Sequence, residues 1–269
     1  MQIEKIQVRS FAVRNPAAGR GGLLFVHGGY VDGACWEVNF FPFFSRQGYD
    51  CHAVDLSGHG GSEGRERLDE IGIGDYAADV AQAVAMIGRP LTLVGHSMGA
   101  RVVEHYLEAG GEAEAAIFLA PVPVTGMAGS ALQLALRHPG FFGALEAAVR
   151  GDISKETADL MTRIYFAPGV RPHETLQYLP MLCPESQRAI VEMALPKAPL
   201  SWRRRRLPAL VVGGECDAVF PASLLHFMGI AWNAEVRRIC GAGHMLMLDP
   251  QWQNVAEEML AWLNKVRPQ

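Results

Sequence analysis

The residues from Leu93 to Ala100 place Ser97 between two glycines, in the pattern Gly-x-Ser-x-Gly. An apolar run with strand character precedes this pattern, and a stretch with helical periodicity follows it. A serine on such a sharp turn needs small neighbours, because the backbones crowd there, and Gly95 and Gly99 provide the room. The N-terminus of the following helix favours negative charge that develops near the hydroxyl. Ser97 is therefore predicted to be a catalytic nucleophile.

A serine hydroxyl is a poor nucleophile until a base accepts its proton and a carboxylate orients that base. His244 is the candidate base, because it lies in a glycine-rich loop between the last predicted strand and the last predicted helix. Asp217 is the candidate acid, and Glu215 is the competing carboxylate in the same loop. Asp217 is preferred because it lies further into the loop, whereas Glu215 is expected at the end of the strand. The chain order is Ser97, Asp217, His244.

Other polar residues receive structural interpretations. His27, His59 and His96 belong to turns or precede the nucleophile, so we expect each to support the fold. Asp249 follows the candidate base and is interpreted as a helix cap. The run Arg203 to Arg206 could bind an anion, but its place before a strand favours a solvated entry segment.

The composition argues against several classes of protein. The chain has 269 residues and a formal net charge of −4, so it lacks the basic surface that nucleic acids require. With 49% hydrophobic and 19% charged residues, it is too apolar to stay disordered. The N-terminus has no signal-peptide core, and no apolar run reaches the length of about 18 residues that predicts a membrane span.

The cysteines indicate a compartment. They are five in number and include no Cys-x-x-Cys pair, which favours thiols in a reducing cytoplasm over a disulfide framework or a zinc site. We therefore expect a cytoplasmic protein without a metal site.

Short apolar runs alternate with helical patterns along most of the chain. The predicted strands are Ile3 to Val13, Leu23 to Val26, Cys51 to Val54, Leu91 to Val94, Ala116 to Leu119, Ala209 to Val212 and Val236 to Ile239. The predicted helices are Asp75 to Ile87, Gly99 to Glu108, Ser223 to Ala231 and Trp252 to Leu263. Uninterrupted apolar strands suit a sheet that is buried on both faces, so the alternation predicts an α/β fold with a doubly wound, mostly parallel sheet.

The alternation stops in residues 122–200, here called the insert, which shows helical patterns, many prolines and no convincing strand. Its acidic and basic residues balance, and it is rich in leucine, methionine and aromatic side chains. It can be an ordinary helical subdomain or a lid with an apolar underside. We expect a core of residues 1–121 and 201–269 with the insert as a helical cap, and Phe141 and Phe142 as substrate contacts.

The chain resembles the α/β-hydrolase fold superfamily, and its serine esterases and lipases in particular. Four features carry the resemblance: His27-Gly28-Gly29 after a strand, the Asp55 to Ser62 segment, the elbow at Ser97, and the loops of Asp217 and His244. The chain order of the triad is the one expected of this fold.

The resemblance implies an oxyanion hole made by the backbone N–H groups of Met98 and Gly29. The loop from His27 to Trp36 also resembles that of plant methylesterases and hydroxynitrile lyases, and Tyr30 in it is expected to contact the substrate. Gly58 to Gly61 is interpreted as a turn that binds no phosphate, with Asp55 and Ser62 structural.

The combined prediction is a serine hydrolase that cleaves a carboxylic ester through an acyl-enzyme, with a hydrophobic acyl substrate and no cofactor. Thioesters, lactones, amides and carbon–carbon bonds beside a carbonyl stay open as alternatives, because they share this chemistry. A ligand-sensing relative of such enzymes is a further alternative. The partner is expected to be a small-molecule substrate, and the sequence does not indicate an oligomeric state.

Overall fold

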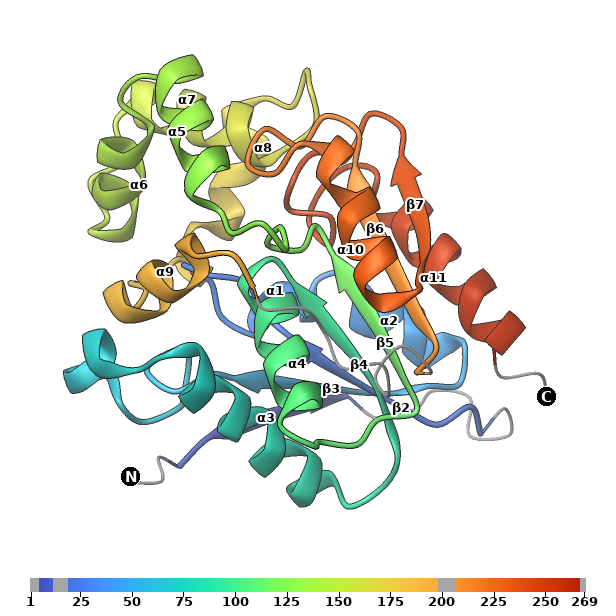
Figure 1. Ribbon diagram of the computed structural model, residues 1–269. Coiled ribbons are helices and arrows are strands. Elements are labelled where there is room, and N and C mark those ends of the chain that lie inside the picture. The colour runs from blue at the N-terminus through green and yellow to red at the C-terminus, as the bar shows by residue number, and fades with distance from the viewer. Residues whose placement is uncertain (1–4, 12–18, 198–206, 267–269) are drawn as a thin grey trace.

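The computed structural model describes residues 5–11, 19–197 and 207–266, and they form an α/β fold around a seven-stranded sheet (Figure 1). The strand order is β1-β3-β2-β4-β5-β6-β7, with β1 antiparallel to β3 and all other neighbours parallel. The strands are β1 Gln7–Phe11, β2 Gly22–Val26, β3 Asp50–Asp55, β4 Leu91–His96, β5 Ala115–Leu119, β6 Ala209–Gly214 and β7 Glu235–Ile239.

The central strands form because their residues are apolar and find cover on both faces. Every residue of β2, β4, β5 and β6 is buried, as expected for uninterrupted apolar runs in a parallel sheet. Each predicted strand is confirmed within a few residues, although the first is shorter than predicted and its ends lie outside the described residues. Arg203 to Arg206 also lie outside the described residues, so their interpretation stays a prediction.

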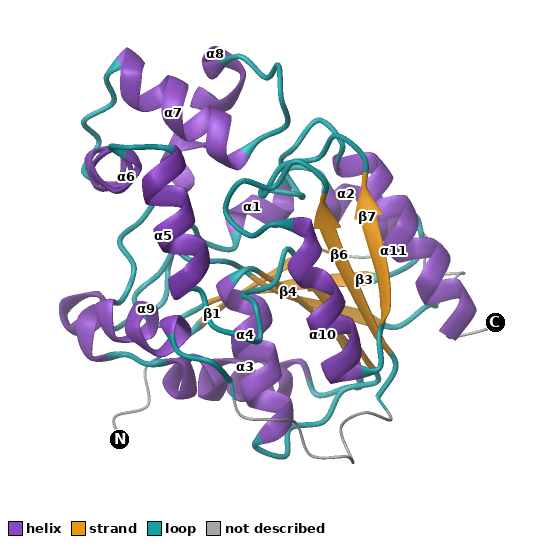
Figure 2. Ribbon diagram, turned by 45° about the horizontal axis from the view of Figure 1, so that its top comes forward, coloured by secondary structure: helices purple, strands orange, loops and turns teal. Residues whose placement is uncertain are grey.

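Helices cover both faces of the sheet (Figure 2). The α-helices are α1 Ala34–Glu37, α2 Phe40–Arg46, α3 Ile73–Ile87, α4 Met98–Glu108, α5 Ala128–Arg137, α6 Phe141–Val149, α7 Lys155–Tyr165, α8 Pro172–Thr175, α9 Gln187–Ala194, α10 Leu225–Trp232 and α11 Trp252–Val266. Short 3₁₀ helices occur at Arg65–Glu70, Leu176–Met181 and Ala222–Leu224. Helices α3, α4 and α10 share one apolar cluster with the sheet, and α1, α2 and α11 share the other. None of the described helices has the length and apolar character needed to cross a membrane.

The described part of the insert holds α5 to α9 and no strand of the sheet, as the sequence predicts. Helices α5 to α8 gather to one side of the sheet, at the upper left of Figure 1. Four buried side chains form a separate small cluster there, and they are Leu134, Phe141, Leu145 and Ile164. The second half of the insert contacts the core: Leu182 forms an isolated antiparallel β-bridge with Val31, which follows β2.

Candidate active site

Ser97 lies between the carboxyl end of β4 and the first residue of α4, with φ 51° and ψ −115°. Residues other than glycine rarely adopt such a positive φ, so the backbone of Ser97 is strained. The flanking glycines permit the turn. A Cβ on Gly95 would lie 2.5 Å from the carbonyl oxygen of Gly99, and one on Gly99 would lie 2.3 Å from that of Val26. Strand and helix therefore meet backbone to backbone beneath the serine.

His244 and Asp217 meet Ser97 at the carboxyl edge of the sheet. The Nε2 atom of His244 lies 3.2 Å from the Ser97 Oγ, and its Nδ1 lies 2.8 Å from the Asp217 Oδ2. A carboxylate accepts at Nδ1, which leaves Nε2 free to accept the serine proton. The second oxygen of Asp217 accepts hydrogen bonds from the N–H groups of Val219 and Phe220, at 2.8 and 2.9 Å. The three residues thus form one continuous chain of hydrogen bonds.

Glu215 does not take part in this chain. It follows β6 directly, is exposed, and accepts a long hydrogen bond of 3.4 Å from the N–H of Gly241. This placement matches the expectation that Glu215 lies at the strand end.

The loop that carries His244 is held by the insert. The N–H groups of His244 and Met245 both donate to the Tyr165 carbonyl, each at 2.9 Å. One oxygen of Asp249 accepts from Ala167 in the insert at 2.7 Å and from Gly243 at 3.1 Å, and its other oxygen accepts from Gln251 at 3.0 Å.

The helix-cap interpretation of Asp249 is therefore incomplete. This fully buried side chain serves the start of α11, but it also ties the histidine loop to the insert. Burial raises the pKa of Asp249, and the three N–H donors oppose that rise.

Two backbone N–H groups near the serine are unpaired within the described part of the chain. Those of Gly29, after β2, and Met98, at the start of α4, have no hydrogen-bond partner among the described residues. Both residues line the pocket that contains Ser97 and His244. Tyr30 follows with φ 65°, so the loop turns sharply just beyond Gly29. Two such N–H donors in the wall of the serine pocket suit the expected oxyanion hole.

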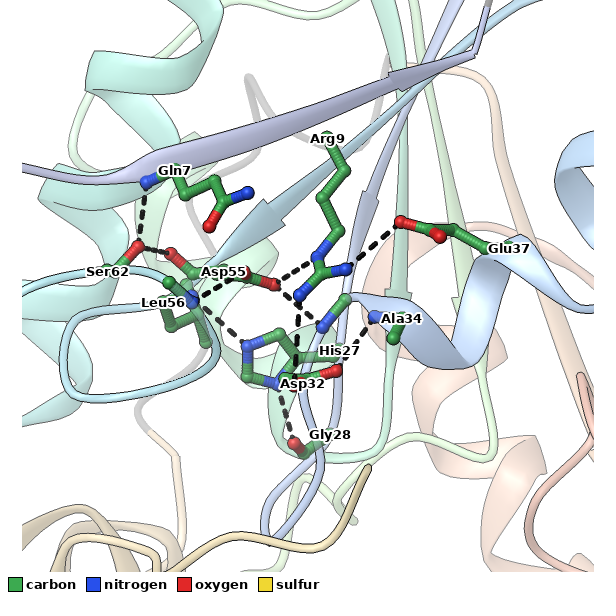
Figure 3. Close-up of polar contacts among 12 residues, drawn as sticks. Gln7, Arg9, His27, Gly28, Asp32, Ala34, Glu37, Asp55, Leu56 and Ser62 are labelled. Atoms are coloured by element: carbon green, nitrogen blue, oxygen red, sulfur yellow. Dashed lines mark hydrogen bonds and ion pairs between the residues drawn. The ribbon is translucent and has the colours of Figure 1, made fainter. Parts of the chain in front are cut away.

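A network of hydrogen bonds around Asp55 holds the loop that follows β2 (Figure 3). One oxygen of Asp55 accepts from Arg9 Nε and from Gly33 N, each at 2.9 Å, and its other oxygen accepts from Gly61 N at 3.0 Å. Burial opposes ionisation, but these donors outweigh it and lower the pKa of Asp55. Ser62 Oγ donates to the Asp55 carbonyl at 2.6 Å. These contacts confirm that Asp55 and Ser62 are structural.

His27, His59 and His96, which the sequence predicts to support the fold, are all buried and hydrogen-bonded. His27 Nε2 accepts from Leu56 N at 3.1 Å, and burial and the charge on His59 lower the pKa of His27 to about 4. His96 Nε2 donates to the His244 carbonyl at 3.0 Å, and burial holds the pKa of His96 well below its usual range. Both therefore support the site as neutral rings, and His59 is described below.

Two adjoining pockets lie at the site, and one of them contains the serine. The first, of about 810 Å³ including its mouth, contains Ser97, His244 and the three predicted substrate contacts, Tyr30, Phe141 and Phe142. Phe141 is buried, whereas Phe142 is 51% exposed and lies at the rim.

The second pocket, of about 710 Å³ including its mouth, lies among α6, α7 and the 3₁₀ helix Leu176–Met181. The two pockets share Gly29, Tyr30, Leu145, Tyr165 and Met245. Their walls are mostly apolar, which suits hydrophobic ligands.

The sequence reasoning missed Glu185, whose fully buried carboxylate belongs to the wall of the serine pocket. It lies 3.1 Å from His59 Nε2 and accepts 2.8 Å hydrogen bonds from the Tyr76 hydroxyl and the Ser186 N–H. The only sequence signal is a charged residue in Pro184-Glu185-Ser186, directly before α9, and that pattern equally suits an exposed helix start. Among the described residues, no cluster of His, Cys, Asp and Glu could hold a metal ion.

A mostly parallel sheet with a strained serine elbow, and with acid and histidine loops at the same edge, defines the class of α/β proteins with a nucleophile elbow. The model of the alpha/beta hydrolase family matches residues 23–258, and the chain belongs to that family.

Individual relatives are more distant. A pyrethroid hydrolase from Sphingobium wenxiniae is 32% identical over 77 residues, which cover 29% of this chain and 27% of that relative. The chain thus aligns with about a quarter of that protein's length.

Two solved structures illustrate the shared fold. A bromoperoxidase from Bacillus anthracis has a TM-score of 0.74 at 20% identity, covering 97% of this chain and 96% of that chain. A thermophilic esterase from Thermogutta terrifontis has a TM-score of 0.71 at 19% identity, covering 98% and 94%.

Proposed function

We propose that the protein is a serine hydrolase that cleaves carboxylic esters. The observation that carries this proposal is the chain of hydrogen bonds from Ser97 Oγ through His244 to Asp217, at 3.2 and 2.8 Å. The pyrethroid hydrolase relative, which shares part of its sequence with this chain, also supports hydrolysis.

The reaction follows from the roles of these groups. Ser97 Oγ attacks the ester carbonyl carbon while His244 Nε2 accepts its proton and Asp217 orients the imidazolium. The carbonyl oxygen becomes an oxyanion that accepts hydrogen bonds from Gly29 N and Met98 N. Collapse breaks the bond to the alcohol, which leaves with the proton from His244. Water then attacks the acyl-enzyme with His244 as base, and Ser97 regains its proton as the acid departs.

The decisive variant is Ser97→Ala. Hydrolysis of p-nitrophenyl esters is expected to fall at least about a thousandfold, because no nucleophile is left to form the acyl-enzyme. A fluorophosphonate is expected to label the wild-type protein at Ser97 and to leave the variant unlabelled. Near-native turnover in Ser97→Ala would refute the assignment. A preference for thioesters would replace the alcohol by a thiol as the leaving group, and a preference for lactones would keep the released alcohol in the same molecule as the acid. Both results would keep the mechanism.

Two carboxylates of one loop provide a matched test of the acid. Asp217→Asn is expected to lower kcat by at least about a hundredfold, since the amide no longer holds the productive tautomer of His244. Glu215→Gln changes an exposed carboxylate two positions earlier and is expected to leave kcat unchanged. The reverse result would make Glu215 the acid.

The substrate proposed is an ester with apolar groups on both sides of the carbonyl, and the insert is proposed to act as a lid that lines the space for them. Support comes from the two apolar pockets that meet at Gly29 and Tyr30, beside the serine. One substituent would occupy each pocket.

Two alanines of the insert test this arrangement. Ala158 lines only the pocket among α6 and α7, and Ala131 lines only the serine pocket. For an ester that is bulky on both sides, Ala158→Phe and Ala131→Phe are each expected to lower kcat/KM about tenfold, because the new ring fills the pocket. With a p-nitrophenyl acetate, one of the two variants should have no effect, and that variant identifies the acyl pocket. If Ala158→Phe has no effect on any bulky ester, the second pocket takes no substrate.

A further inference from the structure

Glu185 is a buried charge of the insert that lies against the loop of the proposed oxyanion hole. Its Oε2 lies 3.4 Å from the N–H of Tyr30, and a Cβ on Gly29 would lie 3.3 Å from the same oxygen. The carboxylate therefore packs directly under the Gly29–Tyr30 backbone.

The same stretch of the insert holds the other side of Tyr30. The N–H of Cys183 donates to the Tyr30 carbonyl at 3.0 Å, and Leu182 forms an isolated β-bridge with Val31. The backbone of Tyr30 is thus held at both its N–H and its carbonyl while its φ is 65°. A positive φ in a bulky residue persists only where its surroundings enforce it, and here the insert supplies those contacts.

A lone carboxylate at this place would repel an oxyanion on Gly29, so its charge must be balanced. His59 Nδ1 lies 3.1 Å from the Ser57 carbonyl, which can only accept, and His59 Nε2 lies 3.1 Å from Glu185. Both ring nitrogens therefore face acceptors, as an imidazolium requires. Burial opposes charge on both groups, but their mutual attraction outweighs it, so the pKa of His59 is raised and that of Glu185 is lowered.

We propose that Glu185, as one half of a buried ion pair with His59, is a positioning residue that holds the Gly29 N–H in place for the oxyanion. This inference rests on the proposed ester hydrolysis. The carboxylate contacts no reacting atom. It acts by fixing the Gly29–Tyr30 backbone, and His59 cancels its charge so that the site can accept a developing negative charge.

The test is Glu185→Gln, because the amide is neutral and cannot accept hydrogen bonds at both of its polar atoms. Both acylation and deacylation pass through an oxyanion, so kcat is expected to fall about tenfold or more whichever step limits, with KM within about twofold. The value of kcat is calculated from the concentration of active sites, which is measured by complete titration with a fluorophosphonate. Ser97 Oγ attacks the carbonyl carbon of a trifluoromethyl ketone, and the ketone oxygen becomes the oxyanion of a hemiketal. Such a ketone should bind more weakly by a factor similar to the fall in kcat.

Glu192→Gln is the matched control. Glu192 belongs to the same part of the insert and accepts a 2.8 Å hydrogen bond from the N–H of Ile73, away from the serine. Its substitution is expected to change neither kcat nor binding of the ketone. A purely structural role for Glu185 would lower the melting temperature and leave both of these values per active site unchanged.

Tyr76→Phe keeps the test valid if Glu185→Gln does not fold. It removes one 2.8 Å hydrogen bond to Glu185 while the ring stays in the core, so kcat and the affinity for the ketone are both expected to fall by a similar factor, which is smaller than in Glu185→Gln. Wild-type kcat and ketone affinity in the folded variants would overturn the inference, as would a rise in KM alone. Failure of the proposed function is distinct, because the wild-type protein would then hydrolyse no ester and Ser97→Ala would change nothing.

Discussion

Backbone strain gathers around the serine. Four described residues other than glycine have a positive φ, and three of them, Tyr30, Ser97 and Ala120, follow the carboxyl ends of β2, β4 and β5. The fourth, Asn233, ends α10 and lies elsewhere. Such conformations cost about 1–3 kcal/mol each, so their concentration at one sheet edge is typical of a functional site. The surrounding close contacts must be strong enough to enforce them.

Gly99→Ala is expected to destabilise the protein by about 2 kcal/mol or more, because its Cβ would lie 2.3 Å from the Val26 carbonyl oxygen and 2.4 Å from that of His27. Backbone atoms cannot move aside as a side chain can. Urea unfolding followed by circular dichroism measures this change.

Gly143→Ala is the control, since Gly143 is exposed in α6 and a Cβ there meets nothing within 4 Å. It is expected to stabilise by about 0.5 kcal/mol through helix propensity. Equal changes in the free energy of unfolding for the two substitutions would show that the close approach to the Val26 and His27 carbonyls does not require a glycine at position 99.

At the scale of elements, the site depends on contacts between loops that are far apart in the sequence. The histidine loop is bonded to Tyr165 and Ala167 of the insert, and the Gly29–Tyr30 loop is bonded to Cys183 and Glu185. The insert therefore holds two of the loops that form the site, besides lining the pocket. A change in the insert is expected to affect the rate as well as substrate selection.

Asp249→Asn tests the bond between the insert and the histidine loop. An amide has one acceptor atom, so at least one of the three N–H groups that donate to Asp249, two of them in buried hydrogen bonds, loses its partner. The expected loss of stability is about 1–3 kcal/mol in urea unfolding, with a lower kcat because the His244 loop is less well held.

Asp69→Asn is the comparison for this variant. Asp69 also accepts a backbone N–H, from Gln187 at 3.1 Å, but this hydrogen bond is exposed. A change within about 0.5 kcal/mol is expected there. If Asp249→Asn is equally mild, the bond does not hold the loop.

For the whole molecule, the sheet divides the core into two large apolar clusters, while α5 to α7 enclose one small cluster of four buried side chains. Regions with little buried apolar area open more easily than the core. The insert is therefore expected to be the least stable part of the described chain.

Hydrogen exchange measured by mass spectrometry tests this expectation. Amides of α5 to α7 should exchange faster than those of β2, β4 and β5, whose residues are all buried. If the insert covers the site, a fluorophosphonate adduct at Ser97 should slow exchange in these helices. Equal protection of the insert and the central strands would contradict the prediction.

The amino-acid sequence alone predicts the alternation of strands and helices in the core, the sheet type and the meeting of Ser97, Asp217 and His244 at one sheet edge. It does not predict the short helices α1 and α2. Each of the predicted features depends on local signals, such as apolar runs and glycine turns, together with the rule that loops after parallel strands share an edge.

Three features become visible once the chain is folded: the Glu185–His59 pair, the second role of Asp249 and the division of the pocket. Glu185 and His59 lie 126 residues apart, and no periodicity relates them. A buried charge is stabilised by whatever partner the packing brings to it, so its role appears only once the insert lies against the sheet.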